Sequence, residues 1–140
     1  MIVSNSVAAL PQHEIVQRQQ TLAWLAENMY RGMPKKKRLA LLHSDNYNNE
    51  SIHQLLLAME STLGQAVLVN QLSATSARQD LMPELSKRSY DVSFCVGEQD
   101  NLLDIAELYT GQLNQSNITI EQILGAGHML PLEQPKLLAK

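Results

Sequence analysis

Apolar residues follow two different spacings along the chain, and the change falls between residues 75 and 90. Before it, apolar residues recur every three or four positions, as they do on one face of an α-helix. The clearest example is Ile52, Leu55, Leu56 and Met59. After it, the stretch VSFCVG at 92–97 alternates with a period of two residues, which is typical of a strand. The pattern therefore predicts a helical region followed by a region that contains strands.

The helical region is expected to cover about residues 11–80. Its first helix should extend from about His13 to Tyr30 and end at Gly32, and a short helix should follow Pro34. Two more helices should lie on either side of Gly64, the second over about residues 65–74. The following stretch ARQDLMPELSK is expected to be a polar connector.

Three strands are expected around this region, at Ile2-Val3-Ser4, at 92–97 and at 118–123. A helix should lie between the last two, from Leu102 to Gln112, and the final residues, 132–140, should begin another. Strand, helix and strand in this order form a βαβ unit, whose strands are parallel. We therefore expect one α/β domain over residues 1–140. It would have a strand at 1–6, helices at about 11–80 and a strand–helix–strand–helix end at about 90–140.

Composition and charge exclude several functional classes. The chain is 44% hydrophobic and 18% charged, which is typical of a globular domain, and its net charge of −3 does not attract nucleic acid or anionic membranes. The basic run at 35–38 has no second cluster to support it, so a solvated helix face explains it best. No apolar run approaches the roughly 18 residues of a membrane span, and no signal-peptide pattern begins the chain. We expect a cytoplasmic protein without nucleic-acid or membrane partners.

Cofactor and metal chemistry find little support in the sequence. His13, His43 and His53 have no metal-ligand spacing among themselves or with the single cysteine, Cys95. Cys95 lies in an apolar run and is expected to be a buried, reduced thiol. We therefore expect neither a metal site nor a cofactor.

Two polar residues follow the last two predicted strands. Asp100 comes three residues after Gly97, and His128 lies in the loop after Ile123. Functional residues of parallel sheets gather at the carboxyl ends of the strands, so the carboxylate can orient the imidazole while the imidazole exchanges a proton. The alternative is a solvated loop aspartate and a loop histidine bonded to backbone.

The stretches GEQD and GAGHMLPLEQP resemble the end of the α/β-hydrolase fold, in which an acid in a G-x-x-D context and a histidine in a G-x-GH context belong to a Ser–Asp–His triad. IVSNSVAAL is similar to the sixth strand of that family, and ARQDLMPEL to the segment that returns from the lid helices. The chain looks most like lidded carboxylic-ester hydrolases such as pimeloyl-carrier-protein methyl ester carboxylesterases and 3-oxoadipate enol-lactonases. The resemblance covers the whole chain but only about the last half of such an enzyme. It implies that Asp100 and His128 are the acid and the base.

The nucleophile that this resemblance implies is missing, because no G-x-S-x-G occurs in the sequence. The nearest arrangement surrounds Ser6, but Pro11 follows closely and no strand intervenes before the helices. We therefore expect a hydrolase-like chain that is inactive by itself. The alternatives are an esterase that uses Ser6 or a serine of a partner chain, and a non-catalytic module that binds an acyl ligand or another protein.

The resemblance also implies partners. The strand Ile2–Ser4 would have an unpaired outer edge, which favours a homo-oligomer or a complementing N-terminal half that pairs with it. A small ester or acyl compound would be the substrate of an active form. Four apolar residues of the helical region either line an acyl pocket or pack in helix cores. They are Trp24, Met29, Met33 and Met59.

Overall fold

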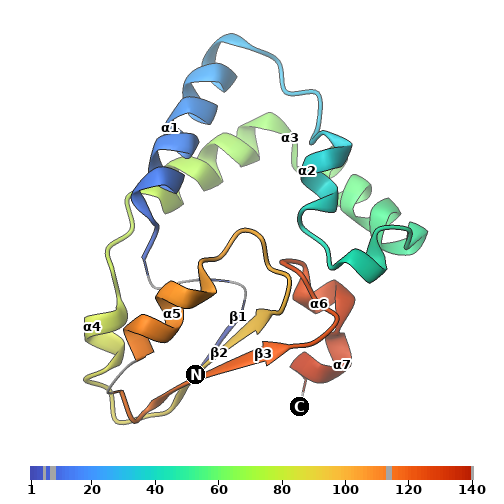
Figure 1. Cartoon of the computed structure of the whole chain (residues 1–140). Helices are drawn as coiled ribbons and strands as arrows, with labels where there is room; N and C mark the ends of the chain where they lie inside the picture. The colour runs from blue at the N-terminus through green and yellow to red at the C-terminus, as the bar shows by residue number, and fades with distance from the viewer. Residues whose placement is uncertain (5, 7–8, 113–114, 140) are drawn as a thin grey trace.

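A parallel sheet with the strand order β1-β2-β3 forms the lower part of the molecule in Figure 1. The computed structural model describes residues 1–4, 6, 9–112 and 115–139. The strands are β1 (Ile2–Ser4), β2 (Val92–Gly97) and β3 (Ile118–Ile123), and both neighbouring pairs are parallel. The three predicted strands and the parallel arrangement of the βαβ unit are confirmed.

Strand β2 is the centre of the fold because its apolar residues are buried on both faces of the sheet. On one face, Val92, Phe94 and Val96 are at most 1% exposed and pack with Leu108 and Ile118. On the other face, Cys95 is 7% exposed and belongs to a separate cluster with Ile123, Ala126 and Leu130. A near-continuous buried run is typical of a strand covered on both sides in a parallel sheet. In β3, by contrast, Ile118 and Ile123 are buried at the ends, Ile120 is half-buried, and Thr119, Glu121 and Gln122 are exposed, as expected for an edge strand.

The helices account for most of the remaining chain. They are α1 (Gln12–Glu27), α2 (Lys35–Leu39), α3 (Glu50–Ser76), α4 (Met82–Leu85), α5 (Ile105–Gln112), α6 (Leu130–Glu133) and α7 (Pro135–Leu138), with a 3-10 turn η1 (Ser44–Asn46). In Figure 1, α1, α2 and α3 lie together above the sheet, and we call this part the helical region. It is inserted between β1 and β2, as the sequence predicted.

Several boundaries differ from the predicted ones. Helix α1 ends at Glu27, short of Tyr30, and the Asn28 side chain donates a hydrogen bond to the Trp24 carbonyl in its last turn. The two helices predicted around Gly64 are both present within the range of α3, and Gly64 between them has a non-helical backbone with φ 68° and ψ −177°. This conformation is nearly confined to glycine, so the sequence placed the break correctly.

Two further segments, the predicted connector before β2 and the predicted last helix, also differ from the prediction. The predicted connector contains helix α4, whose first turn begins where Asp80 Oδ1 accepts the Met82 N–H at 2.9 Å. The helix predicted at 132–140 starts earlier, at Leu130, and is divided into α6 and α7 at Pro135. A proline disfavours the helical conformation of the residue before it, and Gln134 accordingly has φ −134° and ψ 53°.

Helix α3 is the one helix among the described residues that is long and apolar enough to cross a membrane, with a mean hydropathy of 1.2 over its best window. Only 11% of that window is buried in the fold. The helix packs against α1, and the non-helical backbone at Gly64 interrupts it. The absence of a membrane partner stays a prediction.

Candidate active site

The two residues predicted to work together do meet in the structure. Asp100 follows β2, His128 follows β3, and these strands are parallel neighbours, so both loops leave the same end of the sheet. His128 Nδ1 lies 2.9 Å from Asp100 Oδ2 and 3.1 Å from Oδ1. We call this pair the dyad; the structure places the two side chains, while their catalytic role stays a prediction.

The aspartate is fixed by its own loop. Its side chain is 0% exposed, and Oδ1 also accepts the backbone N–H of Leu102 at 2.9 Å. The Asp100 N–H donates to the Gly97 carbonyl at 3.1 Å, which closes the turn after β2. A buried carboxylate whose oxygens are bonded on two sides has one orientation available, so Asp100 can hold the imidazole in a fixed plane.

Glycines allow the two loops to touch. A Cβ atom on Gly97 would lie 2.2 Å from the Gly127 carbonyl oxygen and 2.5 Å from that of Ala126. Gln99 N–H donates to the same Ala126 carbonyl at 3.1 Å. The absence of a side chain at Gly97 therefore brings the acid loop against the histidine loop, and the dyad distance follows from this approach.

The imidazole is accessible, unlike the carboxylate that orients it. The His128 side chain is 26% exposed and lines a cavity of about 220 Å³. With Nδ1 directed to Asp100, Nε2 is the ring nitrogen that can exchange a proton with a reacting group. A buried acid that orients a partly exposed imidazole is the arrangement required of a general base.

Residues from the chain's beginning and from the helical region share this cavity. Ser6 lies on its wall, and its Oγ accepts a hydrogen bond from Arg78 at 3.3 Å. Arg18 lines it too, donating to Thr75 Oγ1 at 2.8 Å and pairing with Glu14 at 3.4 Å. Burial, and then the charge of Arg18, lower the pKa of Arg78. The neighbours Asn5, Val7 and Ala8 lie outside the described residues.

The apolar residues considered for an acyl pocket are dispersed. Trp24 and Met29 line an open cavity of about 900 Å³ beside α1, and Met33 lines a smaller one of about 150 Å³. Met59 is 41% exposed on α3. The cavity beside His128 is lined by other residues. These four side chains therefore do not form one pocket against the dyad.

The cysteine and the basic run considered in the sequence analysis have contacts that explain them as parts of the fold. Cys95 is a free thiol, 7% exposed, and its pKa is raised by burial and by the charge of Glu121. Within the basic run at 35–38, Arg38 turns inward and pairs with Glu60 at 3.7 Å. Among the described residues, no group of three or more histidine, cysteine or acidic side chains has a metal-binding arrangement. The expectation that no metal or cofactor is needed stays a prediction.

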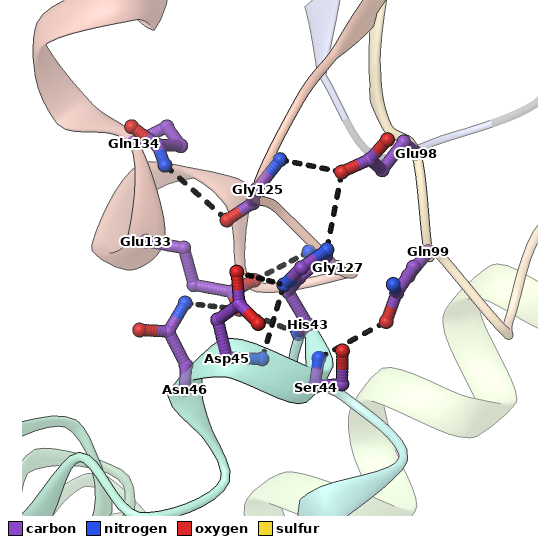
Figure 2. A network of polar contacts seen from close by, with 10 residues as sticks. All are labelled: His43, Ser44, Asp45, Asn46, Glu98, Gln99, Gly125, Gly127, Glu133 and Gln134. Carbon is purple, nitrogen blue, oxygen red and sulfur yellow. Dashed lines mark hydrogen bonds and ion pairs between the residues drawn. The ribbon is translucent and has the colours of Figure 1, made fainter.

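Sequence reasoning missed a polar network beside the dyad, drawn in Figure 2. His43 is 5% exposed, with Nε2 3.1 Å from Glu98 Oε1, and Nδ1 accepts the Asp45 N–H at 3.1 Å. Glu133 accepts the His43 N–H at 2.6 Å and the Gly127 N–H at 2.7 Å. Glu133 belongs to the stretch LEQP already noted after His128, but nothing in its spacing indicated a partner 90 residues away.

The chain is similar to known proteins in structure but not in sequence. Neither protein-family models nor curated proteins match the sequence. Solved structures do match: an α/β-hydrolase enzyme from a Medee basin deep-sea metagenome library (TM-score 0.72, 17% identity), a thermophilic esterase from Thermogutta terrifontis (0.77, 18%) and MenH from S. aureus (0.68, 13%).

The match extends over nearly all of this chain but not of the others. It covers 99%, 98% and 98% of this chain, and 52%, 51% and 54% of the three others, respectively. The chain thus spans about half the length of the solved structures it matches. At these identities the likeness shows the fold alone. The chain has a partial α/β-hydrolase fold, with three parallel strands and an inserted helical region.

Proposed function

We propose that this chain supplies the acid and the base of a serine-type carboxylic-ester hydrolase site. The observation that carries the proposal is the dyad, with His128 Nδ1 2.9 Å from the buried carboxylate of Asp100 at the carboxyl ends of adjacent parallel strands. The resemblance of GEQD and GAGHMLPLEQP to the acid and histidine stretches of the α/β-hydrolase fold supports the proposal. One of the proteins of similar structure, that from Thermogutta terrifontis, is an esterase.

Each residue has one task in this proposal. His128 Nε2 takes the proton of the attacking serine and then returns it to the leaving alcohol. Asp100 keeps Nδ1 protonated and stabilises the imidazolium while it exists. Neither residue attacks the ester, so the pair needs a nucleophile and donors for the oxyanion.

We propose that the nucleophile and the oxyanion donors come from a polypeptide other than this chain. The sequence has no G-x-S-x-G, and its likeness covers about half of the matched structures. Strand β1 offers a place for the additional polypeptide, because it pairs only with β2 among the described residues and Ile2 is 65% exposed. A strand added there would continue the sheet. The proposed occupant is a second polypeptide that carries the G-x-S-x-G turn, since a second copy of this chain has the same sequence and lacks it.

The test is complementation. The purified chain is mixed with a polypeptide that carries the preceding strands of an α/β-hydrolase sheet and a G-x-S-x-G turn, and hydrolysis of p-nitrophenyl butyrate is measured. We expect no turnover by either part alone and turnover by the mixture. His128→Ala and Asp100→Asn should each reduce it, the latter by up to about 10,000-fold. Equal turnover by the wild-type mixture and the His128→Ala mixture would contradict the proposal.

A second candidate is an esterase that uses Ser6 of this chain. It is favoured by one observation, that Ser6 and His128 line the same cavity. In this case the purified chain hydrolyses the ester without a partner, and a fluorophosphonate probe labels it. Ser6→Ala abolishes both signals, while the neighbouring Ser4→Ala retains the labelling. Turnover that survives Ser6→Ala would exclude Ser6 as the nucleophile.

A further inference from the structure

The backbone on both sides of His128 is held by one segment of the helical region, residues 40–46, which we call the strap. The Met129 N–H donates directly to the Leu41 carbonyl at 3.1 Å. The Gly127 N–H donates to Glu133 Oε2 at 2.7 Å, and Glu133 Oε1 accepts the His43 N–H at 2.6 Å. The residues before and after the imidazole are therefore both tied to the same short piece of chain.

The strap also holds the acid loop. The Ser44 N–H donates to Gln99 Oε1 at 3.0 Å, and His43 Nε2 lies 3.1 Å from Glu98 Oε1. Because His43 Nδ1 accepts the Asp45 N–H, the proton of the neutral ring is on Nε2 and points at Glu98. Figure 2 shows Glu98 also bonded to the Gly125 N–H, at 2.7 Å. The strap thus bridges the two loops that carry the dyad.

The strap lies against the backbone of Gly127 and leaves no room for a side chain there. A Cβ atom on Gly127 would lie 2.6 Å from the Leu42 carbonyl carbon and 2.7 Å from the His43 nitrogen. Leu42 is 0% exposed and packs with Ile52 and Leu56 of α3, so the strap is itself anchored in the helical region. A movement of the strap must therefore move the turn before His128.

We propose that Glu133 is a positioning residue for His128, and that through it the helical region sets the alignment of the dyad. Glu133 is the group through which the strap acts, because its carboxylate accepts from His43, from Asn46 Nδ2 at 3.0 Å and from Gly127. All three partners are donors. A carboxylate can serve all of them, whereas an amide would direct its own N–H₂ group at one of them.

The consequence for catalysis rests on the function proposed above, but the alignment itself can be measured without turnover. The probe is the His128 Nδ1–H proton, observed by NMR in ¹⁵N-histidine-labelled full chain, and its rate of exchange with water. In Glu133→Gln this rate should rise by at least about tenfold, because the loss of a charge-assisted hydrogen bond loosens the turn at Gly127.

Two further variants make the result specific. Glu27→Gln makes the same change at an exposed residue at the end of α1 and should leave the exchange rate unchanged. Asn46→Ala removes one of the three donors and should raise the rate by a smaller factor than Glu133→Gln. Asn46→Ala also keeps the test decisive if Glu133→Gln does not fold. The free energy of unfolding, measured on each variant, separates alignment from general loss of stability.

The outcomes distinguish the two proposals. If wild type shows no protected Nδ1–H proton, the dyad does not form in solution and the proposed function fails. If wild type shows it and neither variant changes its exchange, Glu133 does not position His128, and the proposed function stands. In a complemented, active site, Glu133→Gln should lower kcat with little change in KM, since Glu133 lies outside the cavity beside His128.

Discussion

The central strand and the two long helices differ in how much of their apolar surface is buried. In β2, Val92, Phe94 and Val96 are at most 1% exposed. Helix α1 has 16 residues and α3 has 27, yet buried residues in them are few: Leu25 in the first, Ile52 and Leu56 in the second. Large apolar side chains of the helical region instead face outward, including Trp24 at 52% and Met29 at 78% exposure.

Polar contacts replace apolar packing between these helices. Gln65 Nε2 donates to the carbonyls of Leu25 at 2.9 Å and Asn28 at 3.2 Å, while its Oε1 accepts the Tyr30 N–H at 2.6 Å. A region with few buried apolar contacts opens locally at a lower free energy than a packed core. The sheet is therefore expected to hold its own geometry, and the helical region to depend on single hydrogen bonds.

The largest expected effect is a cavity in the sheet. Phe94→Ala should lower the free energy of unfolding by about 3–5 kcal/mol, because it removes a fully buried aromatic ring. Trp24→Ala, its counterpart in the helical region, removes a larger but half-exposed ring and should cost clearly less. Urea denaturation followed by circular dichroism measures both. Equal losses would show that the helical region is as tightly packed as the sheet.

A smaller effect is expected where the two regions meet. Gly127→Ala should cost about 1–3 kcal/mol, because the added methyl group overlaps backbone atoms of the strap. Gly32→Ala has room for the methyl group and is strained only by its φ of 98°. The Nδ1–H signal of His128 should be lost in the first variant and kept in the second. Its survival in Gly127→Ala would mean that the dyad tolerates displacement of the strap.

Within the helical region, Gln65→Ala should cost about 1–2 kcal/mol through its lost hydrogen bonds. The effect should be local, so amide exchange should accelerate in α1 while β2 keeps its protection. Gln54→Ala on the same helix removes an exposed side chain that donates to Glu50 of the same helix, and it serves as the control. Uniform acceleration over α1 and β2 would show that the two regions open together.

The smallest expected effect is a change in stability at alkaline pH. Burial, followed by the Glu60 carboxylate to which Tyr30 donates, raises the pKa of Tyr30 from 10.0 to about 12. The folded state thus keeps a proton that the unfolded state releases, so this contribution to stability is complete below pH 10 and is lost as the pH rises towards 12. Tyr30→Phe should remove that part of the pH dependence. Ultraviolet titration of tyrosinate supplies the midpoint, and a value near 10 would contradict the contact with Glu60.

Much of the sheet and the dyad followed from the sequence. The alternation at 92–97 and the βαβ order predicted parallel strands, and strands of that kind end at one side of the sheet, where Asp100 and His128 are found. The break at Gly64 was predictable because only glycine adopts its backbone angles readily. These features depend on local periodicity and on single residues with one strong preference.

The strap and its bonds did not follow from the sequence. His43 and Glu133 have no periodic signal, and their contact joins segments 90 residues apart. Glu133 accepts the backbone N–H groups of His43 and Gly127, which every residue except proline carries, so no residue pairing marks these two bonds in advance. The separation of Trp24 and Met29, which line one cavity, from Met33, which lines another, depended equally on how the helices pack.

The pairing of β1 with β2 has a consequence for the order of folding. The Met1 amino group donates to the Asp91 carbonyl across 90 positions, whereas Thr119 and Ser93 meet across 26 positions on β3 and β2. Closing the longer loop costs about 1 kcal/mol more in chain entropy, so β2 and β3 should associate first and β1 should join last. Once β1 has joined, the whole helical region is a closed loop with its two ends side by side on the sheet. A loop of this kind can be lengthened or exchanged without altering the strand order beneath it.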